Sequence, residues 1–235
     1  MKNSGLYAVV TGDIVGSSKL KTSQRSRLLS VLKSSFNTIK DILPDGIRAP
    51  FEIHRGDSFQ GVVSRPETAL QVAIAIRASL RHGFETKQRR DALDARIAVG
   101  VGSIDFLPAG RGYEGDGEAF RRSGPILDKM KGDQRLLIRT PWQAVDAELD
   151  IECALLDTLI NRWSGEQAQA ILGQIRGLTQ EMAAEEFGVS QPAVRQRLKS
   201  AGGWAIEELC HRYEQLIYEK EAQGLIMKHN KARSL

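Results

Sequence analysis

Strand-like and helix-like apolar patterns alternate through the first 140 residues of this chain, and strand patterns are absent after that point. A short apolar run over 6–15 predicts a buried strand, and apolar residues at helical spacing over 23–43 predict a helix. Residues 51–53 and 59–63 are strand patterns that flank the turn-like segment Arg55-Gly56-Asp57-Ser58. They predict a β-hairpin, so the opening order is strand, helix, strand, strand.

The same alternation continues to the end of this region. Ser64 and Glu67 have the spacing of a capping box, which predicts that a second helix begins at Ser64. A strand over 96–102, a helix over 118–130 and a strand over 136–138 follow. The predicted order β-α-β-β-α-β-α-β favours an α+β sandwich, in which a mixed sheet related to ferredoxin-like folds carries helices.

Past Thr140 the pattern is helical and is interrupted only by glycines. This change predicts a domain boundary near Thr140 and an all-α second domain. The expected divisions are an α/β domain over 1–140, a connector helix over 141–165, a helical domain over 166–225 and a basic tail over 226–235.

Composition limits the class of protein. The chain has 235 residues, of which 41% are hydrophobic, and no apolar run has the roughly 18 residues that span a bilayer. The short apolar stretch after Met1 does not resemble a secretory signal, so we expect a cytoplasmic protein that does not bind membranes. The two cysteines form no CxxC pair, which argues against structural zinc or a disulfide framework. A net charge of +4 permits nucleic-acid binding without demonstrating it.

The segment 177–198 has the features of two short helices that cross closely. Ala184 is small enough for a close helix crossing, and Gly188 suits a turn that needs a positive φ. Ser190 is placed to cap the second helix, with Pro192 in its first turn. The alternative is a purely structural role, in which the two helices form a hairpin that packs against the interior of the protein.

The second helix carries three positive charges and no acid between Ser190 and Lys199, whereas the helix before it carries three glutamates. This division of charge is typical of a recognition helix that enters the major groove, backed by a supporting helix. The residues expected to contact double-stranded DNA are Ser190, Gln191, Arg195, Gln196, Arg197 and Lys199. The segment resembles sigma-factor region 4 and related regulator modules, in which Leu-Thr-Gln-Glu opens the first helix. That resemblance implies a helix-turn-helix.

Three segments of the first domain resemble the class III nucleotidyl cyclases. They are Thr11-Gly12-Asp13-Ile14-Val15-Gly16-Ser17-Ser18, Arg55-Gly56-Asp57-Ser58-Phe59 and Gly117-Glu118-Ala119-Phe120-Arg121-Arg122-Ser123. The resemblance covers about residues 5–140 and implies that Asp13 and Asp57 hold Mg²⁺ or Mn²⁺. It also implies a nucleoside triphosphate as ligand and a homodimer. The residues expected to contact its phosphates are Ile14, Gly16, Ser17, Ser18, Arg121 and Arg122.

The chain departs from the cyclase pattern at the positions that perform cyclisation. Aligned on Gly117, the family's Asn and Arg positions hold Arg121 and Pro125, and the base-selecting position holds Ile53. The whole arrangement, with Asp-Gly-x-Ala-Phe at Asp116–Phe120, resembles the SatD family of bacterial proteins. We therefore expect a DNA-binding regulator with a degenerate cyclase-like domain that dimerises. Two alternatives stay open, namely an active nucleotide-processing enzyme regulated by the helical domain and a dimeric scaffold without ligand.

Overall fold

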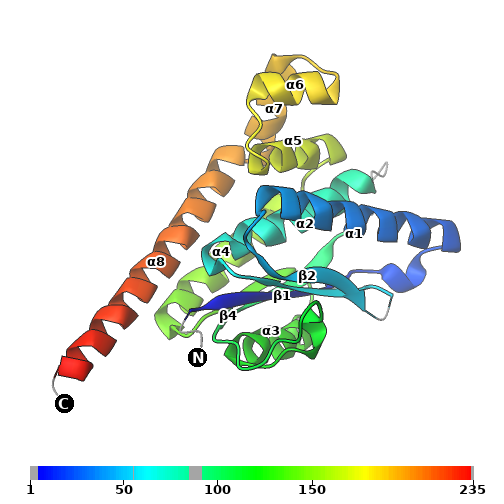
Figure 1. Cartoon of the computed structure of the whole chain (residues 1–235). Helices are drawn as coiled ribbons and strands as arrows, with labels where there is room; N and C mark the ends of the chain where they lie inside the picture. Colours follow the sequence, from blue (N-terminus) through cyan, green and yellow to red (C-terminus); the bar gives the residue numbers. More distant parts are fainter. Residues whose placement is uncertain (1–4, 55, 85–91, 234–235) are drawn as a thin grey trace.

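The computed structural model describes residues 5–54, 56–84 and 92–233, and its centre is a five-stranded mixed sheet (Figure 1). The strand order is β2-β3-β1-β4-β5, in which β4 and β5 are parallel and the other neighbours are antiparallel. The strands are β1 Tyr7–Ile14, β2 Ile47–His54, β3 Ser58–Val63, β4 Ala95–Gly102 and β5 Leu136–Arg139. The predicted order of strands and helices in this part is confirmed.

Helices cover both faces of the sheet. Helices α1 (Thr22–Ile42) and α2 (Ala69–Gly83) lie on one face, and α3 (Glu118–Lys129) lies on the other (Figure 1). Leu28, Leu32 and Ile39 follow the predicted helical spacing of α1, and all three are buried. Their burial explains why this amphipathic segment packs as a helix against the other core elements.

The predicted start of α2 was wrong. Pro66–Thr68 forms a 3₁₀ turn, and the α-helix begins only at Ala69. The capping box does not form because its side chains have other partners. The Ser64 hydroxyl donates to the carbonyl of Asp45, and the Glu67 carboxylate accepts from Arg65.

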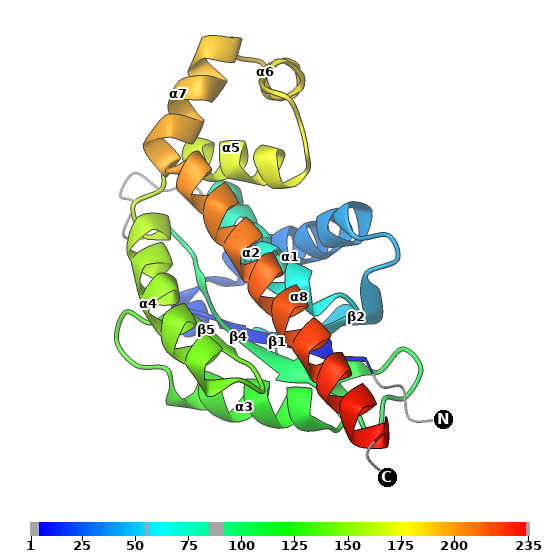
Figure 2. The same ribbon diagram turned by 90° about the vertical axis from the view of Figure 1, so that its left-hand side faces the viewer.

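Five helices follow the sheet. They are α4 Gln143–Ile160, α5 Gly165–Ile175, α6 Gln180–Phe187, α7 Gln191–Ala201 and α8 Gly203–Arg233. Helix α8 runs back along the body beside α4, whereas α6 and α7 project from it (Figure 2). The backbone of the predicted basic tail continues α8 to Arg233, and residues 234–235 lie outside the described part. Within the described residues, no helix combines the length and apolar composition needed to cross a bilayer.

The core continues across the predicted boundary at Thr140. Helix α2 is packed by α5 on the side away from the sheet, and Trp163, Ile171 and Ile206 belong to the same buried cluster as the sheet residues. The Tyr213 hydroxyl of α8 donates to the carbonyl of Pro66 at 3.0 Å. The change in sequence pattern at Thr140 is therefore not accompanied by a break in packing.

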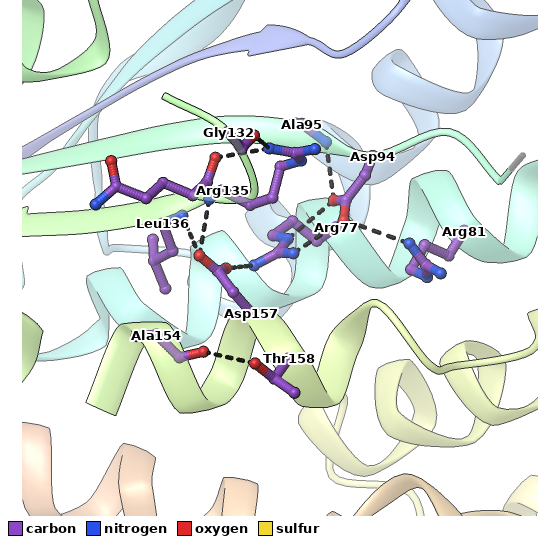
Figure 3. Close-up of polar contacts among 11 residues, drawn as sticks. Arg77, Arg81, Asp94, Ala95, Gly132, Arg135, Leu136, Ala154, Asp157 and Thr158 are labelled. Atoms are coloured by element: carbon purple, nitrogen blue, oxygen red, sulfur yellow. Dashed lines mark hydrogen bonds and ion pairs between the residues drawn. The ribbon is translucent and has the colours of Figure 1, made fainter. Parts of the chain in front are cut away.

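A buried ion-pair network ties α4 to the sheet (Figure 3). The guanidinium of Arg77 on α2 is fully buried and donates twice to Asp94, each time at 2.9 Å, and once to Asp157 on α4. Asp157 also accepts from the backbone N–H groups of Arg135 (2.7 Å) and Leu136 (3.3 Å) at the start of β5. Through Arg77, Asp94 joins α2 to the start of β4, and Asp157 joins α2 to α4 and to the start of β5.

Candidate functional site

A cleft of ≈340 Å³ lies where β1 passes into α1, beside the turn between β2 and β3. The chain leaves β1 through Gly16, whose φ of 74° a glycine adopts without strain. The lining residues are Ser17, Ser18, Arg25, Leu28, Leu29, Gly56 and Asp57. The structure therefore brings Ser17, Ser18 and Asp57 to one cleft, and their predicted roles in binding phosphate and metal stay predictions. Arg55 of the same turn lies outside the described residues.

Asp13 and Asp57 are neighbours across β1 and β3, since Asp13 pairs with Ser58 in the sheet register. The Asp13 carboxylate faces Arg96, whose Nε donates at 2.9 Å and whose Nη2 makes a second contact. This hydrogen bond to Asp13 raises the pKa of Arg96. The Asp57 carboxylate accepts from the Ser17 hydroxyl.

Both aspartates have side-chain partners in this structure. No three side chains of His, Cys, Asp or Glu gather around a common point anywhere in residues 5–54, 56–84 and 92–233. The Asp13 carboxylate is already neutralised by Arg96, which a cation would have to displace. That Asp13 and Asp57 hold Mg²⁺ or Mn²⁺ stays a prediction.

The backbone N–H groups expected to cradle phosphates are partly engaged. The N–H of Ile14 donates to the carbonyl of Asp57 at 3.2 Å, and the N–H of Val15 donates to that of Asp94 at 2.9 Å. The Ile14 N–H is thus used at the end of β1, and its contact with a phosphate stays a prediction. The hydroxyls of Ser17 and Ser18 are the polar groups of this loop that line the cleft.

Sequence reasoning missed Arg25. It lies in the first turn of α1 and lines the cleft, and its Nε donates to the carbonyl of Leu20 at 3.3 Å. Several charged residues lie near the start of this helix, and the sequence alone does not indicate which of their side chains faces the cleft. Only the fold shows that the Arg25 side chain lines this cleft.

Arg121 and Arg122 lie away from this cleft. Arg121 forms ion pairs with Asp105 (3.0 Å) and Asp116 (2.8 Å). Arg122 pairs with Glu118 and donates to the carbonyl of Val101, a residue that lies opposite Ala8 on β1. Asp13 is five residues further along β1, or about 17 Å at 3.3–3.4 Å per residue. The structure does not bring the two arginines to the Ser17–Asp57 cleft, and their binding of a phosphate stays a prediction.

Helices α6 and α7 form a small unit with its own apolar contacts. Ala183, Ala184 and Val194 are buried together, packed by Leu178, Phe187, Val189 and Leu198. The Thr179 hydroxyl accepts from the N–H of Met182 and caps α6, and Gly188 joins the two helices with a φ of 66°. The Ser190 hydroxyl makes no cap hydrogen bond, so the predicted capping of α7 was wrong. Ser190 stands at the N-cap by its backbone alone.

The outer surface of α7 is polar, cationic and free of acids. Arg195, Gln196 and Lys199 are exposed, and Arg195 and Lys199 form no ion pair with any acid in the described part of the chain. Arg197 is half-buried and donates to Gln169 at 3.4 Å. Gln191, at the start of α7, donates to Gln180 at 2.8 Å.

The acidic residues of α6 do not neutralise this surface. Glu186 pairs with Arg176 at the end of α5, with its second oxygen 3.0 Å from Nη2. The hydrogen bond from Arg176 holds the pKa of Glu186 below its usual value. The positive charge of α7 therefore faces solvent.

A larger cleft of ≈470 Å³ lies elsewhere, between the 3₁₀ turn at Pro66–Thr68, α5 and α8. None of the site residues predicted from the sequence lines it. Size alone does not make it the functional site, since Ser17, Ser18 and Asp57, three of the residues predicted from the sequence, line the smaller cleft.

Comparison with known proteins gives matches among solved structures only; no family model and no curated protein matches the chain. The active GGEEF domain of a diguanylate cyclase from Vibrio cholerae is 20% identical, with a TM-score of 0.39 over 59% of this chain and 85% of that chain. The guanylyl cyclase Cya2 is 14% identical, with a TM-score of 0.38 over 63% and 80% of the two chains. A monomeric adenylate cyclase structure from Trypanosoma brucei is 14% identical, with a TM-score of 0.41 over 57% and 73%. All three scores are low, and the functional assignment below rests on the residues of this chain.

Proposed function

We propose that this chain is a DNA-binding regulator that contacts a duplex through α7. The observation that carries the proposal is the exposed, acid-free surface of α7, on which Arg195 and Lys199 stand one turn apart without an acidic partner among the described residues. Two like charges at this spacing repel each other by a few tenths of a kcal/mol, which an external anion relieves. Phosphates of a duplex supply such anions at a regular spacing.

The packing of α7 argues against the internal hairpin. Val194 and Ala201 are buried toward the protein, so the helix is anchored without using its cations. Helices α6 and α7 also stand clear of the body (Figure 1), so a duplex meets this surface before it meets the sheet. Exposure, positive charge and a position beyond the body are the features that a groove-reading helix requires.

Removing the two unpaired cations tests this assignment. We expect the double variant Arg195→Ala with Lys199→Ala to bind duplex DNA more weakly and to lower the slope of log K against log salt by about 2. Fluorescence anisotropy with a labelled duplex at several salt concentrations measures both quantities. The matched control is Lys33→Ala with Lys40→Ala, which removes the same net charge from exposed positions on α1. Equal behaviour of the two double variants would reject α7 as the contact surface.

For the first part of the chain we propose a phosphate-bearing nucleotide in the Ser17–Asp57 cleft. Ser18 and Arg25 line it and supply a hydroxyl and a guanidinium that can donate to a phosphate, whereas the Ser17 hydroxyl already donates to Asp57. Tripolyphosphate is expected to raise the melting temperature of the full chain, and Arg25→Ala is expected to abolish that rise. Arg27→Ala on the same helix is the control, since Arg27 stacks over Phe84 and does not line the cleft.

A nucleotide-processing enzyme is the second candidate, because Asp57 places a carboxylate inside the same cleft. Incubation with each nucleoside triphosphate and Mn²⁺ distinguishes the two functions. Product that disappears in both Asp13→Ala and Asp57→Ala would establish an enzyme. If no nucleotide is converted and none shifts the melting temperature, the first part of the chain is a scaffold.

We further propose that the regulator acts as a homodimer. A two-fold dimer presents two copies of α7 to an operator with matching symmetry, which increases both affinity and specificity. Sedimentation equilibrium of the full chain, with and without duplex, measures the assembly. A monomer under both conditions would contradict the dimer while leaving DNA binding by α7 unaffected.

A further inference from the structure

The two helices of the projecting unit are joined by a side-chain hydrogen bond at their N-termini. Gln180 is the first residue of α6, and Gln191 is the first residue of α7. Nε2 of Gln191 donates to Oε1 of Gln180 at 2.8 Å, and both side chains are half-buried. A long, flexible side chain at the reading end of α7 is thus held in one orientation.

The pairing leaves a defined set of groups on Gln191. A carboxamide has two N–H donors and one carbonyl oxygen that accepts. One N–H is used by Gln180, so Oε1 and the second N–H of Gln191 stay available. A planar carboxamide carries one N–H on the same side as its oxygen and one on the far side.

We propose that Gln180 is a positioning residue that presents Gln191 to adenine in the major groove. This inference rests on the proposed binding of DNA by α7. In the major groove adenine offers the N6 amino group as donor and N7 as acceptor, which complements the carbonyl and the free N–H of Gln191. Guanine offers two acceptors there and so opposes the Gln191 carbonyl. The preference for adenine is built into the protein before the duplex arrives, because the pairing has already restricted Gln191.

The hydrogen bond is not needed to hold the two helices together. Ala183, Ala184 and Val194 already form a buried contact between them, and Gly188 closes the turn. Loss of the Gln180 side chain therefore removes the restraint on Gln191 and leaves the scaffold of α6 and α7 in place.

The test begins with selection of preferred duplexes from a randomised pool by the full chain. One adenine per half-site is expected to be required, and replacing it by 7-deazaadenine, which lacks the N7 acceptor, is expected to lower affinity about tenfold. Gln191→Ala is expected to remove this preference. Gln180→Ala is expected to reduce it strongly, whereas Gln180→Glu is expected to retain it, since a carboxylate still accepts from Gln191.

The control is Gln143→Ala, which removes the same side chain from the first position of α4. Affinity for a random duplex and its salt dependence are expected to be unchanged in Gln180→Ala, because Gln180 is neutral. A full adenine preference in Gln180→Ala would overturn the proposal, as would additive losses in the Gln180→Ala, Gln191→Ala double variant. If the unaltered chain binds no duplex, the proposed function fails as well, a result distinct from binding without adenine preference.

Discussion

The buried network of Arg77 leads to a large and specific effect on stability. In Asp157→Ala three hydrogen bonds disappear, one from Arg77 and two from the backbone N–H groups of Arg135 and Leu136. Arg77 keeps its two bonds to Asp94 but loses one of its two buried counter-charges. Breaking a buried ion pair from one side typically costs about 3–5 kcal/mol, much of it from the partner left uncompensated. We expect a loss in that range.

Such a loss is large for a protein of this size. Stabilities of single domains are about 5–15 kcal/mol, and each kcal/mol lowers the melting temperature of a chain of 150–250 residues by about 2–4 °C. Asp157→Ala is therefore expected to melt about 6–20 °C lower than the unaltered chain. Urea unfolding followed by circular dichroism and by tryptophan fluorescence gives the free energy directly.

Asp150→Ala on the same helix is the matched control. Asp150 pairs with Arg139 at the surface, where both side chains are partly exposed, so its removal is expected to cost about 0–1 kcal/mol. If the losses of unfolding free energy in the two alanine variants differ by less than 1 kcal/mol, burial does not make the Arg77 network more stabilising than a surface ion pair, and the reasoning is wrong.

Three further predictions concern glycines and thiols. Gly100→Ala should cost more than about 2 kcal/mol, since a Cβ there would lie 2.1 Å from the carbonyl of Ala119, and chemical denaturation checks this. Gly188→Ala should cost about 1–2 kcal/mol through its positive φ and weaken duplex binding, as measured by melting and anisotropy. Burial raises the pKa of Cys210 to about 12, so native labelling by iodoacetamide should be slow at pH 8 and rise about tenfold per pH unit up to that pKa; fast labelling at pH 8 would contradict the burial.

The order of elements was predictable because each segment has a period of its own and glycine or proline separates it from the next. Local contacts decide such features, and they lie within the reach of a sequence pattern. The start of α2 was not predictable in this way, because Glu67 is held by Arg65 and by Tyr218, a residue 151 positions later. These tertiary hydrogen bonds compete with the capping-box hydrogen bond, and Glu67 makes the tertiary ones instead.

The candidate site was predictable in part for the same reason. Ser17, Ser18 and Asp57 follow from the turns that contain them. The pairing of Asp13 with Arg96 joins residues 83 positions apart, and the cleft position of Arg25 depends on how α1 is rotated. Arg77 is one of two arginines in the otherwise mostly apolar helix α2, and its partners lie 17 and 80 positions away. Ion pairs between residues so far apart depend on the fold, and they produce no periodic pattern in the sequence.

The packing of α2 between the sheet and α5 also determines how the molecule responds to heat and to ligands. A fragment cut at Thr140 would uncover apolar side chains of α2 that α5 and α8 normally shield, and it would aggregate more readily than the full chain. Because both halves share this interior, they are expected to unfold in one cooperative transition. A compound held near Ser17 and a duplex held by Arg195 would then each protect the whole chain from unfolding, even without any change in shape between the two places.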